Sequence, residues 1–292
     1  MAPESDLLRA SLMPVSSTLD LSVVIVNWNT SELLRDCLTS VSAHVVVGTN
    51  AEIIVVDNAS SDGSAAMVER EFPQARLIRN SRNLGFAYAN NLAIRISLGR
   101  YVLLLNSDTV VPEGAVPALI EFMNDHPDAG ACGPRLIRPD GLPQAYSFGR
   151  DPTLRYLAQR AVSRLLLQRD LHKWDTDEVE TVDWVSGACL LARRATIHQV
   201  GLLDEAMFMY FEDNDWCLRM RQAGWQIYHC PFVSVVHLGG RSLVNNPSAR
   251  ATYYHSLQCF YQKHYSTLAC IALRLSIAAY RLVCSVRYVG RS

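Results

Sequence analysis

Two acidic clusters about a hundred residues apart are the groups in this sequence most suited to chemistry. Residues 101–108 read Tyr-Val-Leu-Leu-Leu-Asn-Ser-Asp, which predicts a buried strand that ends on the carboxylate of Asp108. Open α/β sheets bind ligands beyond the carboxyl ends of their strands. The second cluster is Glu212-Asp213-Asn214-Asp215. One carboxylate could hold a metal ion while the other removes a proton.

Asn106-Ser-Asp108 is the candidate metal site. A nucleoside diphosphate with Mg²⁺ or Mn²⁺ needs few protein ligands, because phosphate and water oxygens fill the other positions. The alternative is that Asp108 caps the helix expected after Pro112. His237 ends a later strand, and a neutral imidazole binds Mn²⁺-type ions, although a lone histidine is more often structural.

Asp213 is the preferred candidate for a general base, with Glu212 as its competitor. Both follow the apolar segment 207–211, whose packing should desolvate a carboxylate, raise its pKa and make it a better base at neutral pH. The alternative is that these acids only favour the start of a helix. Asp215 and Arg219 have the i, i+4 spacing of a structural ion pair.

Two further segments suit a nucleotide. Asp57 ends the second expected strand, where a carboxylate can accept a hydrogen bond from a ribose or a base N–H; the alternative is a helix cap, for which Ser60–Asp62 are better placed. Residues 83–91, Asn-Leu-Gly-Phe-Ala-Tyr-Ala-Asn-Asn, open a helix. Gly85 would let a ligand approach the backbone, and a helix N-terminus favours a diphosphate.

The order of elements that must position these groups predicts an α/β fold. Strands alternate with helices in the first 110 residues, as in a parallel sheet with right-handed crossovers. Residues 146–181 lack a clear pattern and are interpreted as a lid or acceptor-facing insertion. The expected strands are 21–26, 53–56, 75–78, 101–105, 187–192, 225–228 and 233–236, and the expected helices begin near 30, 62, 85, 113 and 213.

Composition excludes several classes of protein. The chain of 292 residues is 49% hydrophobic and 19% charged, as expected for a globular protein. A net charge of −1 gives no reason to expect nucleic acid. The eight cysteines include no C-x-x-C pair, and residues 1–20 lack a secretory signal pattern, so we expect a flexible tail there and a cytoplasmic protein. Dinucleotide-binding, P-loop and nucleophile-elbow motifs are absent from the sequence.

Residues 268–289 are apolar but interrupted by arginines, so they do not resemble a helix that spans a bilayer. Arg274, Arg281 and Ser285 fall on one side of an imperfect amphipathic helix. That pattern favours a peripheral position on the inner face of the membrane. The alternative is a terminal helix packed on the core or on a second copy of the chain, which would make the protein a homo-oligomer.

Taken in order, these motifs resemble glycosyltransferase family 2, especially its rhamnosyltransferase-like and galactofuranosyltransferase-like branch. The resemblance covers roughly residues 20–245. It rests on Val23-Val-Ile-Val-Asn-Trp-Asn29, Asp57-Asn-Ala-Ser-Ser-Asp-Gly63, the 83–91 segment, Leu105-Asn-Ser-Asp108, Tyr210-Phe-Glu-Asp-Asn-Asp-Trp-Cys-Leu-Arg219 and His237-x-Gly-Gly-x-Ser242.

The resemblance implies a GT-A fold, with a Rossmann-like, mostly parallel sheet between helices and an inverting mechanism. The GT-A domain would span residues 21–245, divided into a nucleotide-binding half (21–112) and an acceptor-binding half (113–245), and a helical extension would span 246–292. Asp108 would be the last residue of the family's D-x-D motif and bind Mg²⁺ or Mn²⁺ with His237, and Asp213 would be the base. Asp57 would contact the nucleotide base. Further donor-binding residues would be Asn27, Asn29, Asn83, Gly85, Asn91, Asn106 and Ser107, and residues that hold the donor sugar and acceptor would be Asp183, Trp184, Gly187 and Ala188.

One departure is that Asn106 stands where the family's motif has its first aspartate. A neutral amide lowers the negative charge around the cation, so binding should depend more on His237. The resemblance points to transfer of rhamnose from dTDP-rhamnose, with UDP-sugars as the alternative donors, to a polysaccharide or lipid-linked glycan. The rival interpretations are a sugar-phosphate nucleotidyltransferase, a non-catalytic nucleotide-sugar binding or scaffold protein, and a structural membrane-associated subunit.

Overall fold

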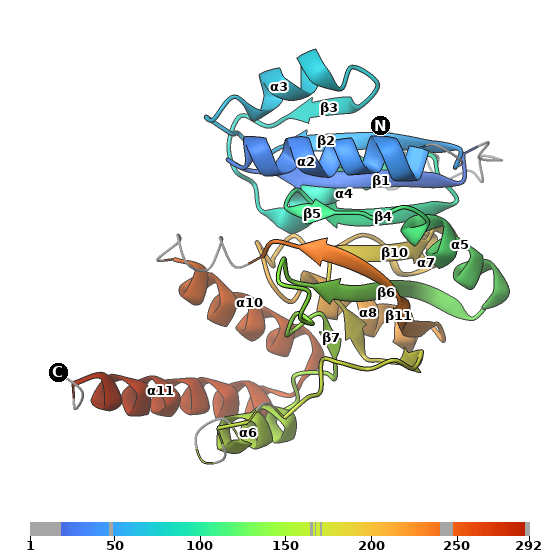
Figure 1. Ribbon diagram of the computed structural model, residues 1–292. Helices are drawn as coiled ribbons and strands as arrows, with labels where there is room; N and C mark the ends of the chain where they lie inside the picture. The colour runs from blue at the N-terminus through green and yellow to red at the C-terminus, as the bar shows by residue number, and fades with distance from the viewer. Residues whose placement is uncertain are drawn as a thin grey trace, which may run out of the picture.

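The computed structural model describes residues 19–46, 49–163, 166, 168–169, 171–239 and 248–289, with side chains described up to residue 281. Nine strands form one central sheet (Figure 1). They are β1 (Leu21–Asn27), β2 (Ala51–Asp57), β3 (Arg76–Arg79), β4 (Tyr101–Asn106), β5 (Thr109–Val110), β6 (Ala129–Ile137), β8 (Glu180–Thr181), β10 (Cys189–Arg193) and β11 (Gln226–His237).

The sheet is parallel in its first half and mixed in its second. Its order is β3-β2-β1-β4-β10-β6-β11-β5, with β8 pairing with β11. The first four strands are parallel neighbours, as the sequence predicts. Strand β10 then runs antiparallel to both β4 and β6, and β5 runs antiparallel to the end of β11. Two short strands, β7 (Phe148–Gly149) and β9 (Trp184–Val185), form a separate pair.

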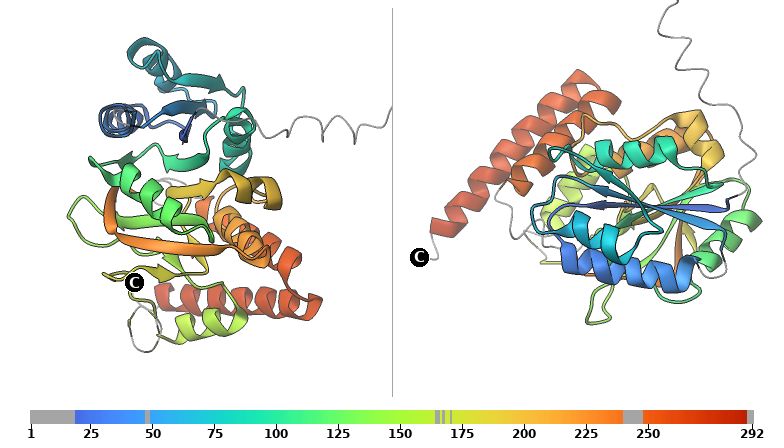
Figure 2. Two further views of the ribbon diagram at one scale, coloured as in Figure 1. Left: turned by 90° about the vertical axis from the view of Figure 1, so that its right-hand side faces the viewer. Right: turned by 90° about the horizontal axis from the view of Figure 1, so that it is seen from above.

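Helices cover both faces of the sheet because successive residues of the central strands are apolar, so that each face is apolar. Val23 and Ile25 pack in one core cluster, whereas Val24 packs in the other. Full burial of such a side chain contributes roughly 1.5–3 kcal/mol. Figure 2 shows helices on opposite faces of the sheet. The first cluster includes α2 (Ser31–Val41), α3 (Ser64–Glu71) and α5 (Ala115–Asp125), and the second includes α4 (Phe86–Ile96), α7 (Arg194–Val200) and α8 (Glu212–Gln222).

Two differences from the predicted elements have physical explanations. Strand β6 was not predicted, because its sequence Ala-Gly-Ala-Cys-Gly-Pro-Arg-Leu-Ile is rich in small residues. A Cβ at Gly130 would lie 2.7 Å from the Trp225 side chain, so close packing accounts for the glycine. The two strands expected at 225–228 and 233–236 are one strand, β11, with a register shift between Cys230 and Ser234. Pro231 lies within that shift, where a ladder N–H is not needed.

The C-terminal extension consists of α10 (Ala249–His264) and α11 (Thr267–Val289), and α11 also contacts α6 (Leu154–Val162). Leu273 of α11 is 2% exposed and shares a core cluster with Phe211 and Phe260. The expected domain boundary at 245 falls in residues 240–247, outside the described residues. Residues 1–18 of the expected tail also lie outside them.

Along the described chain, no helix combines the length and apolar character needed to cross a bilayer. The seven described cysteines are free, and five are buried.

Asp215 joins α8 to α10. It is fully buried, and its Oδ2 accepts a hydrogen bond from Arg219 Nε at 2.9 Å, which confirms the predicted i, i+4 pair. Its Oδ1 lies 2.8 Å from Lys263 Nζ and 2.7 Å from His264 Nε2, both in the last turn of α10. The carboxylate therefore holds the C-terminal extension against the helix that begins with Glu212 and Asp213.

We expect Asp215→Asn to lower the free energy of unfolding by about 3 kcal/mol, because it removes the negative charge of a fully buried carboxylate that contacts Arg219, Lys263 and His264. Urea unfolding at neutral pH measures the change. Asp36→Asn, at an exposed position of α2, is the matched control and should change stability by less than about 0.5 kcal/mol. Equal stability of the Asp215 variant and the wild type would contradict this role.

Candidate active site

Asp108 and His237 lie together because two strand ends are paired. Strand β5 begins directly after Asp108, and its register with β11 sets Thr109 opposite His237. The Leu238 N–H donates to the Asp108 carbonyl at 2.9 Å and closes the pairing. As a result, Asp108 Oδ1 lies 3.1 Å from His237 Nε2, although 129 positions separate the residues in the sequence.

The imidazole of His237 is held from its other side. Its Nδ1 lies 2.8 Å from Gln144 Oε1, and because that oxygen can only accept, Nδ1 carries the proton. Nε2 is then directed toward Asp108 and toward Asn106, whose Nδ2 lies 3.2 Å away. Gly239 permits this arrangement, since a Cβ there would approach Gln144 Nε2 to 2.9 Å.

This set of donors fits a divalent cation such as Mn²⁺. A carboxylate oxygen and an imidazole nitrogen converge, and a hydrogen bond from the other side orients the imidazole as is usual for metal-binding histidines. Within the described residues, no cluster of three or more His, Cys, Asp or Glu side chains could hold a metal ion. Asp108 and His237 alone would therefore bind a cation whose other ligands are supplied by a diphosphate and water.

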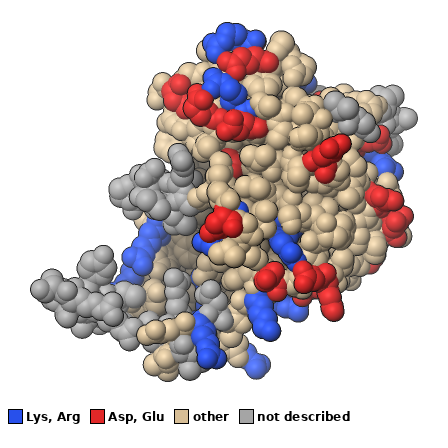
Figure 3. All heavy atoms as spheres, in the orientation of Figure 1, with Lys and Arg blue, Asp and Glu red and all other residues tan. Residues whose placement is uncertain are grey.

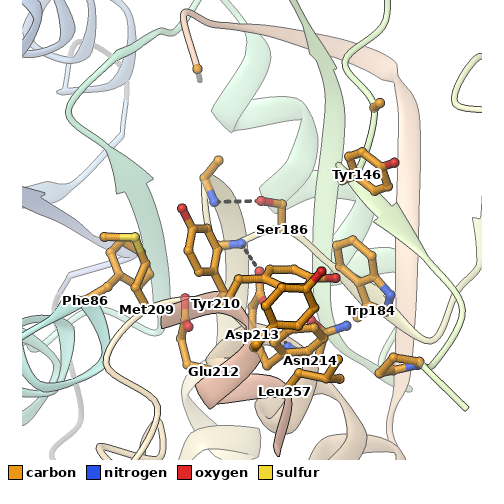
Figure 4. Close-up of a pocket in the computed structure, with 18 of the residues that line it drawn as sticks. Phe86, Tyr146, Trp184, Ser186, Met209, Tyr210, Glu212, Asp213, Asn214 and Leu257 are labelled. Atoms are coloured by element: carbon orange, nitrogen blue, oxygen red, sulfur yellow. Dashed lines mark hydrogen bonds between the residues drawn. The ribbon is translucent and has the colours of Figure 1, made fainter. Parts of the chain in front are cut away.

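Asp213 lies in the first turn of α8 and lines the same cavity, which has a volume of about 940 Å³. Its Oδ2 accepts the Gly187 N–H at 3.0 Å and its Oδ1 accepts the Asn214 N–H at 2.8 Å. Burial raises the pKa of the Asp213 carboxyl, while these two N–H groups lower it. Figure 4 shows Asp213 in the pocket between Tyr210 and Trp184. Both carboxylate oxygens are thus oriented by backbone, and the raised pKa suits a general base.

Glu212 differs from its neighbour. It is 4% exposed, and its Oε2 has no hydrogen-bond partner. Burial raises the pKa of Glu212 well above its usual range, and the nearby charge of Asp213 raises it further. Burial without a hydrogen-bond donor favours the neutral form of Glu212, whereas two N–H groups favour the ionised form of Asp213, so Asp213 is the better candidate to accept a proton.

The segment before these acids is strained. Tyr210 and Phe211 have φ angles of 71° and 67°, in the left-handed region that side chains of this size seldom adopt. Such backbone costs on the order of 1–3 kcal/mol per residue and is concentrated at functional sites. Phe211 packs in the core cluster shared with α10 and α11, which offsets the cost. The Tyr210 hydroxyl is buried without a hydrogen-bond partner and its residue lines the cavity, so a ligand could satisfy it.

Six of the predicted binding residues line the cavity with Asp108, Glu212, Asp213 and His237. These binding residues are Asn83, Asn106, Ser107, Trp184, Gly187 and Ala188. One of them is also fixed by a neighbouring side chain, since Ser107 Oγ lies 2.9 Å from Thr30 Oγ1.

Asn27, Asn29 and Asp57 do not line this cavity, and their side chains form hydrogen bonds within the protein. Asn27 is fully buried and donates to Asp57 Oδ1 at 3.3 Å, while Asp57 Oδ2 accepts the Ser60 N–H. Asn29 Oδ1 accepts the Ser61 N–H at 2.8 Å, so it fixes the loop after β2.

Gly85, Asn91 and Asp183 also lie outside the lining. Gly85 permits a close approach of protein backbone, because a Cβ there would lie 2.6 Å from the Phe208 carbonyl oxygen. Asn91 bonds in both directions with the Leu203 backbone, and Asp183 accepts the Asp151 N–H at 2.8 Å. The binding roles expected of these three residues stay predictions.

Sequence reasoning missed several residues of the cavity. Gln144 gave no signal because it lies after a turn in a segment without periodicity. Asn58 lines the cavity and donates to Asn83 Oδ1 at 2.9 Å, and its place directly after Asp57 could have marked it. Ser186 could have been found from its position beside Gly187. Aromatic residues Phe86, Tyr146 and Tyr253 could not, because apolar side chains in helices and loops more often indicate a core.

Comparison with known proteins identifies the family. The profile described as Glycosyl transferase family 2 matches residues 22–181. The N-acetylglucosaminyl-diphospho-decaprenol L-rhamnosyltransferase of Mycobacterium tuberculosis is 31% identical over 256 residues, which cover 80% of this chain and 81% of that protein. The low-salt glycan biosynthesis hexosyltransferase Agl10 of Haloferax volcanii is 27% identical over 223 residues, covering 75% of this chain and 67% of that protein.

Solved structures support the fold. GalNAc-T7 with UDP, GalNAc and Mn²⁺ has a TM-score of 0.63 at 15% identity, covering 85% of this chain and 48% of that chain. The mannosyltransferase PcManGT from Pyrobaculum calidifontis, in complex with GDP-Man and Mn²⁺, has a TM-score of 0.58 at 16% identity, covering 99% and 87%. With its acidic clusters joined in one cavity, its profile match and its similarity to a rhamnosyltransferase, the chain belongs to glycosyltransferase family 2 and has the GT-A fold.

Proposed function

We propose that this glycosyltransferase moves rhamnose from dTDP-rhamnose to a hydroxyl of a lipid-linked or polysaccharide glycan, with inversion at the anomeric carbon. The observation that carries the proposal is the convergence of the Asp108–His237 pair and Asp213 on one cavity. The similarity to a mycobacterial rhamnosyltransferase whose name specifies a lipid diphosphate acceptor supports the choice of sugar and acceptor.

In the proposed reaction, Asp213 removes the proton of the acceptor hydroxyl as its oxygen bonds to C1 of the donor sugar. The bond from C1 to the diphosphate oxygen breaks at the same time, so the single displacement inverts C1 and releases the nucleoside diphosphate. The Gly187 and Asn214 N–H groups keep the Asp213 carboxylate directed into the cavity. Asp108 and His237 would hold Mg²⁺ or Mn²⁺, which when bound supplies positive charge for the leaving diphosphate.

The donor would lie along the carboxyl ends of β1, β2 and β4. Asn83, Asn106 and Ser107 line the cavity there, and Asp57 is proposed to meet the nucleotide base at the end of β2. Trp184, Gly187 and Ala188 lie beside Asp213, where the donor sugar meets the acceptor.

Peripheral membrane contact through residues 268–289 is part of the proposal. Its support is an outward apolar stripe on α11 formed by Leu268, Ile271 and Leu275, which are 79%, 48% and 67% exposed.

Asp213→Asn should lower the turnover number by ~10²–10⁴-fold, because the amide keeps the shape of the side chain but cannot accept the proton. Glu212→Gln should retain most of the turnover, since we assign Glu212 no proton transfer. Sugar transfer to a glycolipid acceptor at saturating donor measures both variants, and dTDP binding checks that each is folded. Near-wild-type turnover of Asp213→Asn would overturn the assignment of the base, and a large loss only in Glu212→Gln would transfer it to Glu212.

The raised pKa of Glu212 predicts a pH-dependent stability. Its carboxyl has a usual pKa of 4.5, so between that value and the higher folded pKa the folded chain binds a proton that the unfolded chain has lost. Wild-type stability therefore falls as pH rises through this interval, and Glu212→Gln does not share that loss. We expect urea unfolding to show that the free energy of unfolding of Glu212→Gln, relative to that of the wild type, is higher at about pH 8 than at about pH 5. A constant difference between the two proteins would contradict burial of an unpartnered carboxyl.

Metal removal should weaken binding of the donor's diphosphate but not of its nucleoside. We expect dTDP to bind at least about tenfold more tightly with Mn²⁺ than with excess EDTA, because the cation joins two anionic groups. Thymidine is the control ligand and should bind equally in both conditions. Asp108→Ala should remove the effect of Mn²⁺ on dTDP, as measured by calorimetry. Full dTDP affinity in EDTA would exclude the proposed metal site.

A further inference from the structure

The cavity extends beyond the catalytic residues to three helices that lie off the sheet (Figure 1). Each helix contributes residues with i, i+3, i+4, i+7 spacing, so each presents one continuous face to the same space. The faces of α6 and α11 are mainly apolar, and that of α10 is aromatic and basic. The residues are Leu154, Leu157, Ala158 and Ala161 of α6, Arg250, Tyr253, Tyr254 and Leu257 of α10, and Leu273, Ser276, Ile277 and Tyr280 of α11.

Two arginines in this part of the cavity have no acidic partner among the described residues. Arg160 of α6 is half-buried, with its guanidinium 4.6 Å from the centre of the Tyr146 ring, and Arg250 begins the cavity face of α10. By contrast Arg150, which also lines the cavity, lies 3.7 Å from Asp183. A half-buried guanidinium that lacks a carboxylate is suited to bind the anionic group of a ligand.

Aromatic side chains connect Arg160 to the segment that carries the proposed base. Arg160 lies beside the Tyr253 hydroxyl. The Tyr253 ring in turn lies 5.0 Å from the Phe211 ring and 5.8 Å from the Tyr210 ring, the residues just before Glu212 and Asp213. A ligand whose hydroxyl reaches Asp213 could therefore extend an anionic group toward Arg160.

The charges of the cavity are separated. Its described acidic residues, Asp108, Glu212 and Asp213, belong to the catalytic part, whereas Arg160 and Arg250 belong to the helical part. Figure 3 shows basic side chains around the hollowed region toward the C-terminal helices. A ligand whose sugar lies at Asp213 would complement the helical part of the cavity if it carried negative charge next to that sugar and an apolar chain beyond the charge. Inorganic phosphate alone would leave the apolar faces unused, and a neutral lipid would leave the arginines unpaired.

We propose that Arg160 and Arg250 bind the diphosphate of a lipid-linked acceptor, and that the facing stripes of α6 and α11 enclose the first part of its hydrocarbon chain. This inference rests on the proposed function, because it places the acceptor sugar at Asp213. It assigns a second diphosphate site, which uses arginines instead of a metal ion and is separate from the donor site at Asp108 and His237.

Farnesyl diphosphate is the probe for this site. We expect it to bind the full-length chain by calorimetry in excess EDTA, and to stay bound when dTDP and Mn²⁺ saturate the donor site. The double variant Arg160→Gln/Arg250→Gln should weaken binding by about tenfold or more, because charge-assisted hydrogen bonds are lost. Arg155→Gln is the matched control, since Arg155 lies on α6 but does not line the cavity.

The hydrocarbon part of the site has its own matched pair of variants. Ala161→Trp should fill the apolar space and weaken binding of farnesyl diphosphate, with little effect on inorganic pyrophosphate. Val162→Trp should change neither, because Val162 is 51% exposed and lies outside the lining. Circular dichroism and thermal unfolding check that each variant is folded.

Three results would overturn the inference: loss of farnesyl diphosphate binding in EDTA, displacement of the probe by dTDP with Mn²⁺, or unchanged affinity in the double arginine variant. Binding of dTDP by the same proteins tests the proposed function separately. If dTDP binds as expected while the arginine variants leave the lipid probe unaffected, only the acceptor site is wrong. If dTDP does not bind the wild type, the proposed function itself fails.

Discussion

One turn between the end of β9 and the start of β10 couples the two halves of the active site. The Gly187 N–H donates to Asp213 Oδ2, and the neighbouring Ala188 carbonyl accepts the Asn106 N–H, both at 3.0 Å. Adjacent residues thereby fix the proposed base and the strand end that leads to Asp108. A Cβ at Gly187 would lie 3.2 Å from the Phe86 ring, so this turn has little room to shift. The distance between the proposed base and the proposed metal site is therefore set by backbone, which is more rigid than side chains alone.

The sequence predicts the first half of the fold better than the second for a physical reason. In β1, β2 and β4, apolar residues occur in continuous runs because both faces are covered, and each strand ends at a polar residue. Strand β10 has the same composition, and nothing local to it indicates that it runs antiparallel between β4 and β6. Strand β6 depends on small residues that fit under Trp225 and Val185, which is a tertiary requirement. Register across distant segments, such as His237 opposite Thr109, has no local signal either.

The sequence pointed to the residues of the proposed active site where a polar residue stands at the end of a strand or the start of a helix. Asp108 follows a strand, and Asp213 follows an apolar segment and begins a helix. Prediction was weaker where a polar side chain serves packing. Asn91 has the residue type and the motif of a ligand contact, yet its amide joins α4 to the Leu203 backbone. Gln144 shows the reverse: it holds the imidazole of His237, but a glutamine after a turn carries no distinguishing pattern.

The C-terminal helices illustrate how one amphipathic pattern can serve two surfaces. Arginines interrupt the apolar sequence of α11, which favoured a helix lying at a membrane interface. In the structure, Leu273 and Ile277 face inward toward α6 and α10, while Leu268 and Leu275 face outward. When a helix has apolar residues on two sides, packing one side against the protein leaves the other side exposed to water. If the inner face encloses a lipid chain and the outer face meets a bilayer, both faces lose contact with water, and the acceptor can reach Asp213 without leaving the membrane. The apolar residues on two sides of α11 are then explained by its position between the bilayer and the part of the cavity that leads to Asp213.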